Sequence, residues 1–553
     1  MQGPNPSTTN YRMKLSKEYK AGIPGELLNL KARNQRIVQI GYGGIGNCMV
    51  DLYERHVEFD HSQIIVIEMK EDLCREGQAQ HPKVVFVNKK VTKENYARLF
   101  EKYLRPGDML VDLAWYISTA EELEWCHQHN VKYTNAAVED WDVDQADGVQ
   151  DPREFSLYTR QMRVQQQAAS YANDTVNPTA VLTHGANPGW VSHTTKWALR
   201  DWTNHIVKHR DEFPHATDDW VRKATFALRE RRWALLAMLL NVQVIHISER
   251  DTLISKRPRV RNEFICTWSP QGFIEEGMAP AELGWGTHET LKKNVYEYNE
   301  GPKHQICLAT RGMNTLVQTF VPSGSYLGMV VRHEEAYSIP EYLTVFDERG
   351  KAVYRPTVHY AYYPCSDAIA SVYELQSNGY AAPPAERIPK RELIEGEDEL
   401  GCFLLSKHFG AWWIGTLQSV KDAERLLPHQ GPTVLVVAAG VLGSVVYCFE
   451  NPNEGVIHPE KMEEEEVMSV VLPYLQPFVS VSVKGWRPYV TTQYDTKIEA
   501  YVEGDDWTLQ KLLATPIDRI PLEGTVKKKR RVVAGKYKAK SATKSTTKRQ
   551  DSK

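Results

Sequence analysis

The chain has 553 residues, of which 42% are hydrophobic and 25% charged, and its formal net charge is −3 at pH 7. This length and composition suffice for two or three packed domains and exclude disorder over most of the chain. The eight cysteines are scattered singly, without a C-x-x-C pair, which argues against a zinc site and for a reducing compartment.

Charge is distributed unevenly along the chain. Residues 527–553 contain twelve Lys and Arg residues and one acidic residue, a net of +11, which leaves about −14 on the rest. We expect residues 521–553 to form a basic disordered tail, because they offer almost nothing apolar for a core after Val533. The run KKKRR at residues 527–531 fits a nuclear signal or a nucleic-acid tether, but a solubilising tail is an equal alternative. The acidic remainder favours a cationic small-molecule substrate, although many acidic proteins bind no cation.

A glycine-rich turn follows the first strong apolar strand. Residues 1–34 are polar and form an extension, after which IVQIGYGGIG at residues 37–46 ends in G-x-G-x-x-G. Residues 47–59 are predicted to form a helix, and residues 63–67 a second strand. This strand ends in Glu68, 22 positions after Gly46. Such a turn brings backbone N–H groups against a pyrophosphate, and the carboxylate suits a ribose hydroxyl, so the pattern favours NAD over NADP. An ordinary glycine-rich turn before a helix is the alternative.

The alternation of strands and helices continues to about residue 200. Further strands are predicted at 84–87, 108–114, 131–138 and 179–184, with helices at 93–103, 119–129 and 156–171. Six such strands predict an α/β fold with a doubly wound parallel (Rossmann) sheet over residues 35–200. The loops after Ala114, Val138 and His184 would then face the nicotinamide side of the ligand.

After residue 200 the predicted elements are mostly β-strands. Strands are predicted at 242–249, 263–269, 326–333 and 342–347, and they indicate a second α+β domain built on a mostly antiparallel sheet. This domain, residues 201–430, would hold the substrate and a dimer contact. The apolar run at residues 433–449 is too short for a bilayer span, so we expect a buried helix. Residues 431–520 would return to the first domain.

Strand alternation identifies two candidate residues in the second domain. Ile245, Ile247 and Glu249 share one strand face, and Trp268 extends a similar apolar row in residues 263–269. A carboxylate and an indole on the covered side of a sheet suit a bound ammonium group, through an ion pair and a cation–π contact. The alternatives are a salt bridge from Glu249 to Arg250 and plain core packing of Trp268.

Residues 275–287 have the composition of a loop and carry Glu275, Glu276 and Glu282, which are either functional or solvated. His184 and His333 each end an apolar strand, where a histidine transfers protons or serves a structural role. The sequence has no G-x-S-x-G motif and no recognisable cysteine nucleophile, which argues against acyl transfer.

Longer motifs carry a family resemblance. They are GYGGIG at 41–46, AAVEDW at 136–141, HGANPGWVSH at 184–193, HISERDT at 246–252, TWSPQGFIEEGMAPAELGWGT at 267–287, YRPTVHYAYYPCSDA at 354–368 and DELG at 398–401. Together, from about residue 36 to about residue 507, they resemble the bacterial-type homospermidine synthases. These belong to the saccharopine-dehydrogenase-like group of NAD-dependent proteins.

The resemblance implies a transferase that uses NAD as a prosthetic group, without net redox change. An amine carbon of putrescine, or of the aminobutyl part of spermidine, gives a hydride to NAD⁺, and the imine loses ammonia or 1,3-diaminopropane. A second putrescine then attacks, and the same NADH returns the hydride to give homospermidine. The resemblance also implies a homodimer. Localisation is not carried over from it; we expect a cytoplasmic protein without membrane contact, with a nuclear location as the alternative if residues 527–531 act as a signal.

Site residues follow from the same resemblance. It implies cofactor contacts from Gly41, Gly43, Ile45, Gly46, Glu68 and Asn187. It implies substrate contacts from Glu139, Asn187 and Asp398, catalytic roles for Glu249, Trp268, Glu276 and His333, and no metal. Glu249 is our first choice as general base, although coupled carboxylates leave the assignment open.

Two alternatives stay open at this point. One is a net oxidoreductase of the saccharopine or carboxyspermidine dehydrogenase type, which needs an Arg or Lys fork for a substrate carboxylate. The other is a catalytically silent protein that senses NAD or is tethered through its tail.

Overall fold

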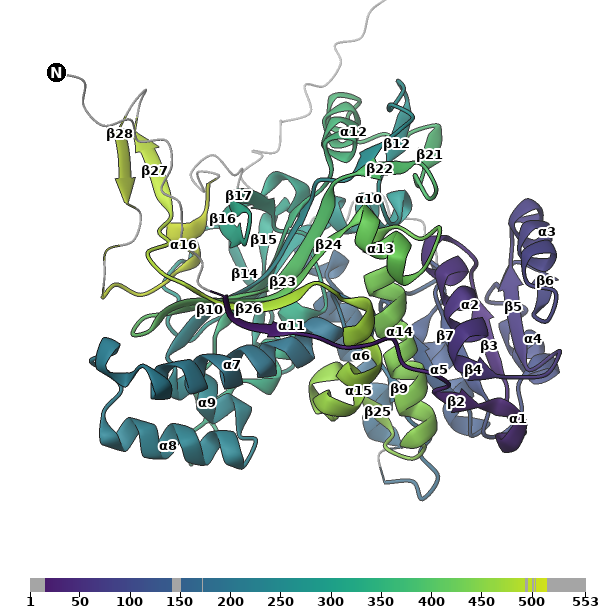
Figure 1. Ribbon diagram of the computed structural model, residues 1–553, viewed down its shortest axis with the longest axis horizontal. Helices are drawn as coiled ribbons and strands as arrows, with labels where there is room; N and C mark the ends of the chain where they lie inside the picture. The colour runs from purple at the N-terminus through teal and green to yellow at the C-terminus, as the bar shows by residue number, and fades with distance from the viewer. Residues whose placement is uncertain are drawn as a thin grey trace, which may run out of the picture.

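The computed structural model describes residues 15–141, 151–171, 173–492, 496–499, 502 and 504–514. The predicted basic tail at residues 521–553 lies outside these described residues. Two sheets dominate Figure 1: a parallel sheet formed by the purple and blue N-terminal strands, and a larger mixed sheet beside it.

The parallel sheet confirms the predicted doubly wound architecture. Its order is β25-β9-β8-β7-β3-β5-β6, and each pair is parallel. Chain order reverses on either side of β3, which lies between β5 and β7, so the ligand-binding crevice opens at the carboxyl ends of these strands. The strands are β3 (Ile37–Ile40), β5 (Ile64–Glu68), β6 (Val85–Asn88), β7 (Met109–Asp112), β8 (Lys132–Asn135), β9 (Ala180–Val181) and β25 (Val456–Ile457).

Helices cover both faces of this sheet. Ile37 packs into one apolar cluster with α2 and α14, whereas Val38 packs into a second cluster with α4, α5 and α6. This alternation is why β3 and β7 are buried along their whole length. The helices are α2 (Gly44–His56), α3 (Glu71–Gln80), α4 (Tyr96–Tyr103), α5 (Thr119–Gln128), α6 (Leu157–Ser170) and α14 (Pro432–Glu450).

Two details differ from the sequence-based expectation for this region. Helix α2 begins at Gly44, inside the glycine motif, instead of at residue 47. Helix α3 was not predicted, because its sequence EDLCREGQAQ buries only Cys74 and Gly77 and so lacks an apolar stripe.

The second sheet has eleven strands in the order β1-β26-β24-β23-β10-β20-β13-β15-β14, with β17 paired to both β16 and β20. The β10–β20 pair is parallel and the other pairs are antiparallel, which confirms the mostly antiparallel prediction. The strands are β1 (Leu15–Tyr19), β10 (Val242–Asp251), β13 (Pro280–Gly284), β14 (Val295–Glu297), β15 (Gln305–Arg311), β16 (Leu316–Val321), β17 (Gly324–Met329), β20 (Thr357–Tyr363), β23 (Glu397–Ser406), β24 (Gly410–Ser419) and β26 (Phe478–Val483).

Smaller elements complete the described chain. Helix α7 packs against β23 and β24, with α8 and α9 beside it, below the mixed sheet in Figure 1. Strand β1 lies within the predicted N-terminal extension, which therefore contributes to this sheet. These elements are α1 (Leu30–Arg33), β2 (Leu28–Asn29), β4 (Val57–Glu58), α7 (Trp190–Lys208), α8 (Asp218–Arg229), α9 (Trp233–Leu239), β11 (Ile254–Ser255), β19 (Ala352–Tyr354), α12 (Ser366–Ser377), β22 (Leu393–Glu395), α13 (Val420–Leu426), α15 (Glu464–Val471), β27 (Tyr489–Thr492), β28 (Thr496–Glu499) and α16 (Leu509–Leu512).

The prediction for residues 263–287 was wrong in two places. Strand β12 (Glu263–Ile265) is short and pairs with β21 (Ala385–Arg387) outside the main sheet. The expected loop is helix α10 (Pro270–Met278), followed by β13, because the Ser269 side chain caps the helix and proline occupies its first turn. Glu282 is fully buried in β13, where it accepts a hydrogen bond of 2.6 Å from Gln305.

Two other predicted strands are shorter than expected. The strand expected at 326–333 ends at Met329, so His333 lies in the connection that precedes helix α11 (Glu335–Tyr342). The strand expected at 342–347 is reduced to β18 (Val345–Phe346). The apolar residues of these segments are buried in a loop and a helix. The alternation of apolar and polar residues alone does not distinguish such segments from a strand.

Helix α14 confirms the predicted buried helix and packs against α2 and β8 of the first sheet. It is long and apolar enough to cross a membrane, but 89% of its most apolar window is buried inside the protein, as in a core helix. A Cβ atom at Gly440 would lie 1.9 Å from the carbonyl oxygen of Gly185, so glycine permits the close approach of this helix to the 185–189 turn.

Replacement of Gly440 by alanine is therefore expected to reduce the free energy of unfolding by about 1–3 kcal/mol or more, because neither backbone can absorb the added methyl group. Urea unfolding followed by circular dichroism measures this loss. Gly22→Ala is the matched control, since a Cβ there meets no atom within 4 Å. Equal stability of the two variants would contradict the contact.

Candidate active site

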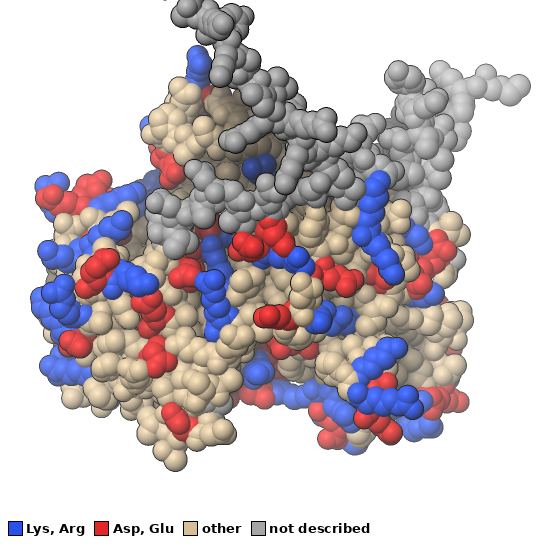
Figure 2. Space-filling view, turned by 180° about the vertical axis from the view of Figure 1, so that it is seen from behind, with Lys and Arg blue, Asp and Glu red and all other residues tan. Residues whose placement is uncertain are grey.

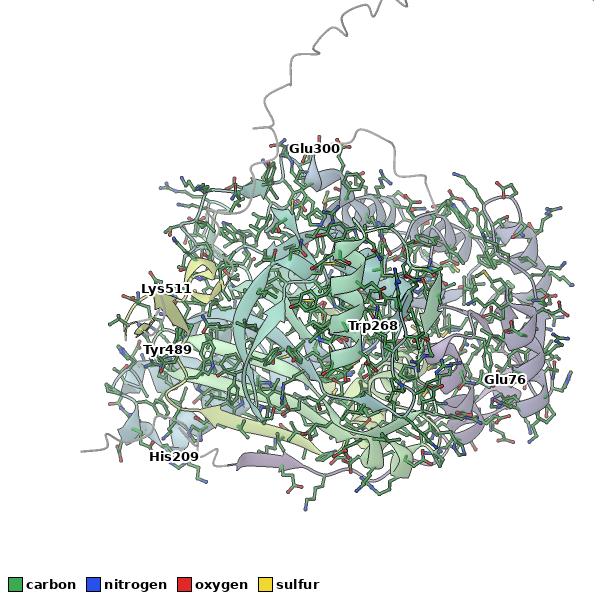
Figure 3. All side chains as sticks on the ribbon, turned by 90° about the horizontal axis from the view of Figure 1, so that it is seen from above. Glu76, His209, Trp268, Glu300, Tyr489 and Lys511 are labelled. Carbon is green, nitrogen blue, oxygen red and sulfur yellow. The ribbon has the colours of Figure 1, made fainter. Side chains whose placement is uncertain are left out.

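A cleft of about 840 Å³ runs between the two sheets. One wall consists of the carboxyl ends of β3, β5 and β7 with the 185–188 turn. The other contains Glu249, Trp268, Glu276, residues 386–388 and Lys390. Figure 3 labels Trp268 near the middle of the view, between the teal and green strands of the mixed sheet and the purple N-terminal elements. The cleft therefore occupies the topological switch point of the parallel sheet.

The glycine turn forms the floor of one end of the cleft. Gly41 has φ +94°, and a Cβ at Gly46 would lie 2.3 Å from the carbonyl oxygen of Gly41. A Cβ at Gly43 would meet nothing within 4 Å, so the backbone there is open to the cleft. Ile45 also lines the cleft, at the first turn of α2. An open backbone beside a helix N-terminus fits a dinucleotide pyrophosphate.

Glu68 is fixed beside this turn. Its Oε2 accepts a hydrogen bond of 2.8 Å from the N–H of Tyr42, and its Oε1 accepts one of 2.7 Å from the N–H of Lys70. The carboxylate lines the cleft at the end of β5. This position suits a ribose diol, and it repels a ribose phosphate.

Glu249, on β10, lies at the end of the cleft opposite Glu68. Its Oε2 accepts hydrogen bonds from Asn187 Nδ2 (3.0 Å) and from the Tyr360 hydroxyl (2.6 Å). Burial raises the pKa of Glu249 to about 7, against the opposing effect of these two donors. A carboxyl with this pKa takes up and releases a proton near neutral pH, as a general base requires.

His333 is held between two carboxylates. Its Nε2 lies 3.2 Å from Glu276 Oε2, and its Nδ1 lies 3.0 Å from Glu335 Oε2. Burial would lower the pKa of His333, but Glu335 and Glu276 outweigh burial and hold the pKa well above its usual value. His333 is therefore an imidazolium at neutral pH, with its two ring N–H groups directed at Glu276 and Glu335.

Trp268 and Trp115 provide an aromatic wall. Both line the cleft, and a Cβ at Gly272 would lie 2.3 Å from Trp115 and 2.7 Å from Trp268, so that glycine fits between the two indoles. The Trp268 Nε1 donates a hydrogen bond of 3.2 Å to the Tyr362 hydroxyl, which fixes the ring. Indole faces at this position can stabilise a cation by a cation–π contact.

Two other residues singled out from the sequence do not line the cleft. Glu139 is buried 3.4 Å from Arg160, within a network that includes Glu275 and Arg332. Asp398 is fully buried and accepts a hydrogen bond of 2.6 Å from Thr433, which itself lines the cleft. Both carboxyls thus act on the cleft at most through neighbouring residues.

His184 does not line the cleft either, although the next residue, Gly185, does. Its Nδ1 lies 2.9 Å from the Gly440 carbonyl and its Nε2 lies 2.9 Å from His193 Nε2. Burial lowers the pKa of His184 to about 4, so the ring is neutral at neutral pH. These contacts support a structural role for His184 and not a role in proton transfer.

Sequence reasoning missed Glu334 and Tyr360 as residues of the cleft. Burial raises the pKa of Glu334 to about 7, and its Oε1 accepts a hydrogen bond of 3.0 Å from the N–H of Val138. Its position directly after His333 was the available signal. Tyr360 lies within an apolar strand. The alternation of apolar and polar residues there gives no sign that its hydroxyl group has a function.

The acidic character of the substrate end is a property of buried groups. Glu249, Glu276 and Glu334 all line the cleft, whereas Figure 2 shows acidic and basic side chains interspersed over one outer face. In the described residues, no group of three or more His, Cys, Asp or Glu side chains is arranged to hold a metal ion. The arrangement can therefore bind a long cation and move protons on and off its nitrogens.

A diamine should bind more tightly as the pH rises toward 7. Glu249 has a folded-state pKa of about 7, so it is largely neutral below that pH and gains its negative charge as the pH increases through it. Calorimetric titration with putrescine from pH 5.5 to 8.5, in two buffers of different ionisation enthalpy, should show proton release below pH 7. Glu249→Gln should weaken the pH dependence, and an unchanged slope in that variant would contradict the assignment.

Comparison with known proteins agrees with this geometry. Residues 37–180 match the family model for the saccharopine dehydrogenase NADP binding domain, and residues 185–481 match that for the saccharopine dehydrogenase C-terminal domain. Homospermidine synthase of Blastochloris viridis is 35% identical over 82% of this chain and 92% of its own length. The Mesorhizobium japonicum homospermidine synthase is 35% identical over 82% of this chain and 91% of its own.

A solved structure is similar over nearly its whole length. Homospermidine synthase of Legionella pneumophila, in complex with NAD, superposes with a TM-score of 0.74 and 30% identity. The match covers 88% of this chain and 98% of that one. The chain belongs to the homospermidine synthase family, within the saccharopine-dehydrogenase-like proteins.

Proposed function

We propose that the chain is a homospermidine synthase, an NAD-dependent transferase that moves an aminobutyl group onto putrescine. The observation that carries the proposal is the continuity of one cleft, which joins the glycine turn and Glu68 to Glu249, Glu276 and Trp268. A dinucleotide site and an acidic, aromatic cation site are thus open to each other. Redox chemistry on an amine needs both in contact.

Gly41, Gly43, Ile45, Gly46 and Glu68 would hold the adenosine and pyrophosphate portion of NAD, and Asn187 would adjoin the nicotinamide. The open backbone at Gly43 and the fixed carboxylate of Glu68 fit this ligand. NAD, when bound, supplies a reversible two-electron acceptor for an amine carbon. Residues 35–200 would act as the cofactor domain and residues 201–430 as the substrate domain.

Glu249 and Glu276 would bind the ammonium groups of putrescine or of the aminobutyl part of spermidine. Trp268 would face the cationic carbon–nitrogen unit and keep water away from it. Both carboxyls are buried, so an ammonium partner would also offset the free-energy cost of ionising them there.

Proton transfers would be divided between Glu249 and His333. Glu249, hydrogen-bonded to Asn187 and Tyr360, would accept a proton from the substrate nitrogen. His333, charged between Glu276 and Glu335, would return a proton to the leaving amine. These roles need opposite protonation states near neutral pH, and the two environments favour them.

The geometry gives less support to a dehydrogenase of the saccharopine type. Such an enzyme needs a cationic fork for a substrate carboxylate. Among the described residues near the substrate end, Arg160 and Arg332 are both paired with Glu275, at 2.9 and 2.5 Å. Neither guanidinium lines the cleft.

We also infer that the protein works as a homodimer, as the family resemblance implies, and that it works in the cytoplasm. A nucleic-acid contact or a nuclear address in the basic tail stays a prediction from the sequence.

Purified protein with NAD⁺ and putrescine should produce homospermidine and ammonia, detected by mass spectrometry, without a steady increase in NADH absorbance. Spermidine as donor should release 1,3-diaminopropane instead. Steady accumulation of NADH would support a dehydrogenase, and no product at all would support a silent NAD-binding protein.

Trp268→Ala should lower kcat/KM by about 30-fold or more, since a cation–π contact with a desolvated cation contributes about 2 kcal/mol. Trp268→Phe keeps an aromatic face and should recover part of this loss. Thermal unfolding of both variants controls for folding. Near-normal turnover in a folded Trp268→Ala protein would reject the proposed role.

A further inference from the structure

The adenosine end of the cleft is closed by a segment from outside the parallel-sheet domain. The cleft that Glu68 lines is also lined by Glu386 and Arg387, in β21, and by Ile388 and Lys390, which follow that strand. The segment reaches the start of α2, because a Cβ at Gly44 would lie 3.7 Å from Ile388 Cδ1. A bound dinucleotide would thus be enclosed between the glycine turn and this segment.

The segment is fixed by buried contacts. Arg387 donates through Nε to Glu263 Oε1 at 2.7 Å, and it also contacts Glu392. The carbonyl of Arg387 accepts a hydrogen bond of 3.2 Å from the N–H of Cys266, and the Lys390 N–H donates to the Ile388 carbonyl at 2.9 Å. The tight turn at the buried Pro389 therefore presents the Lys390 side chain in a defined direction.

Lys390 is a partly buried cation in this turn. Its ammonium group makes no hydrogen bond or ion pair within 4 Å to any of the residues that the structure describes. Burial lowers the pKa of Lys390, and the charges of Arg391 and Lys70 act in the same direction, whereas Glu76 and Glu68 act in the opposite direction. A desolvated ammonium without a close partner, lining a cleft beside a helix N-terminus, is suited to an anionic ligand.

We propose that Lys390 binds the adenosine diphosphate half of the cofactor, so that residues 386–390 act as a clamp supplied by the second domain. The inference rests on the proposed use of NAD. Residues of both domains would then hold one cofactor molecule, and the reduced cofactor would stay bound while the leaving amine is exchanged for the second substrate. Lys390 is a cofactor-binding residue in this account and takes no part in proton transfer.

The direct test is the rate at which NADH leaves the full-length protein. Protein loaded with NADH is mixed with excess NAD⁺, and the loss of bound NADH fluorescence is followed by stopped flow. Lys390→Ala should release NADH about tenfold faster or more, the effect expected for one charge-assisted contact. Lys390→Arg should stay within about threefold of the wild-type rate. Lys421→Ala, which removes the same charge at an exposed position on α13, should release NADH at the wild-type rate.

Fragment inhibitors locate the contact. ADP should compete about tenfold less well against NADH in Lys390→Ala, while nicotinamide mononucleotide should compete equally well in both proteins. If the alanine variant melts at a lower temperature without ligand, Lys390→Gln and Lys390→Arg are compared instead. A release rate within twofold of wild type, or equal weakening of both fragments, would overturn the proposal.

Homospermidine formation is measured separately with the same preparations. Faster NADH release from Lys390→Ala supports the clamp even if no homospermidine is made, in which case only the proposed transferase activity fails. Product formation by wild type together with unchanged NADH release in Lys390→Ala overturns the clamp alone.

Discussion

The buried carboxyl of Glu249 constrains the rest of the site. It receives hydrogen bonds from Asn187, in the turn after β9, and from Tyr360, on β20 of the mixed sheet. A carboxyl at this depth is costly unless donors are fixed around it. The two sheets therefore have to be placed accurately relative to each other, and the cleft between them follows from that placement.

The charged side chains in and around the substrate end of the cleft are paired, so few of them can be substituted without affecting a partner. Glu275 and Glu276 are neighbours in sequence, yet Glu275 pairs with Arg160 and Arg332, whereas Glu276 faces His333. Burial alone would raise the pKa of Glu275, but the two guanidinium groups hold it below its usual value. Glu275 thus anchors the wall of the cleft, whereas Glu276 lines the cleft beside His333.

Much of the parallel domain was predictable, because its signals are local. The G-x-G-x-x-G spacing and the strand that ends in Glu68 identify the dinucleotide end, and alternation in β10 correctly placed Glu249 toward the interior. Trp268 was also placed inside, but for the wrong reason: it lies in the turn before α10 and not in a strand. The position of His333 depends on contacts with α10 and β20, which are distant in sequence, so its pairing with Glu276 was not predictable, whereas Glu335 lies only two residues away. The same applies to Glu139 and Asp398, which local patterns could not place relative to the cleft.

Helix α14 restricts the order in which the fold can be completed. The helix packs on β8 and α2, Gly440 fits against the carbonyl of Gly185, and β25 adds the last strand beside β9. During synthesis, the first 200 residues leave the ribosome long before residues 432–457 exist. The turn that carries Asn187 then lacks its neighbour, so a nascent chain cannot present a finished site to polyamines. The active site forms only when nearly the whole chain has been translated.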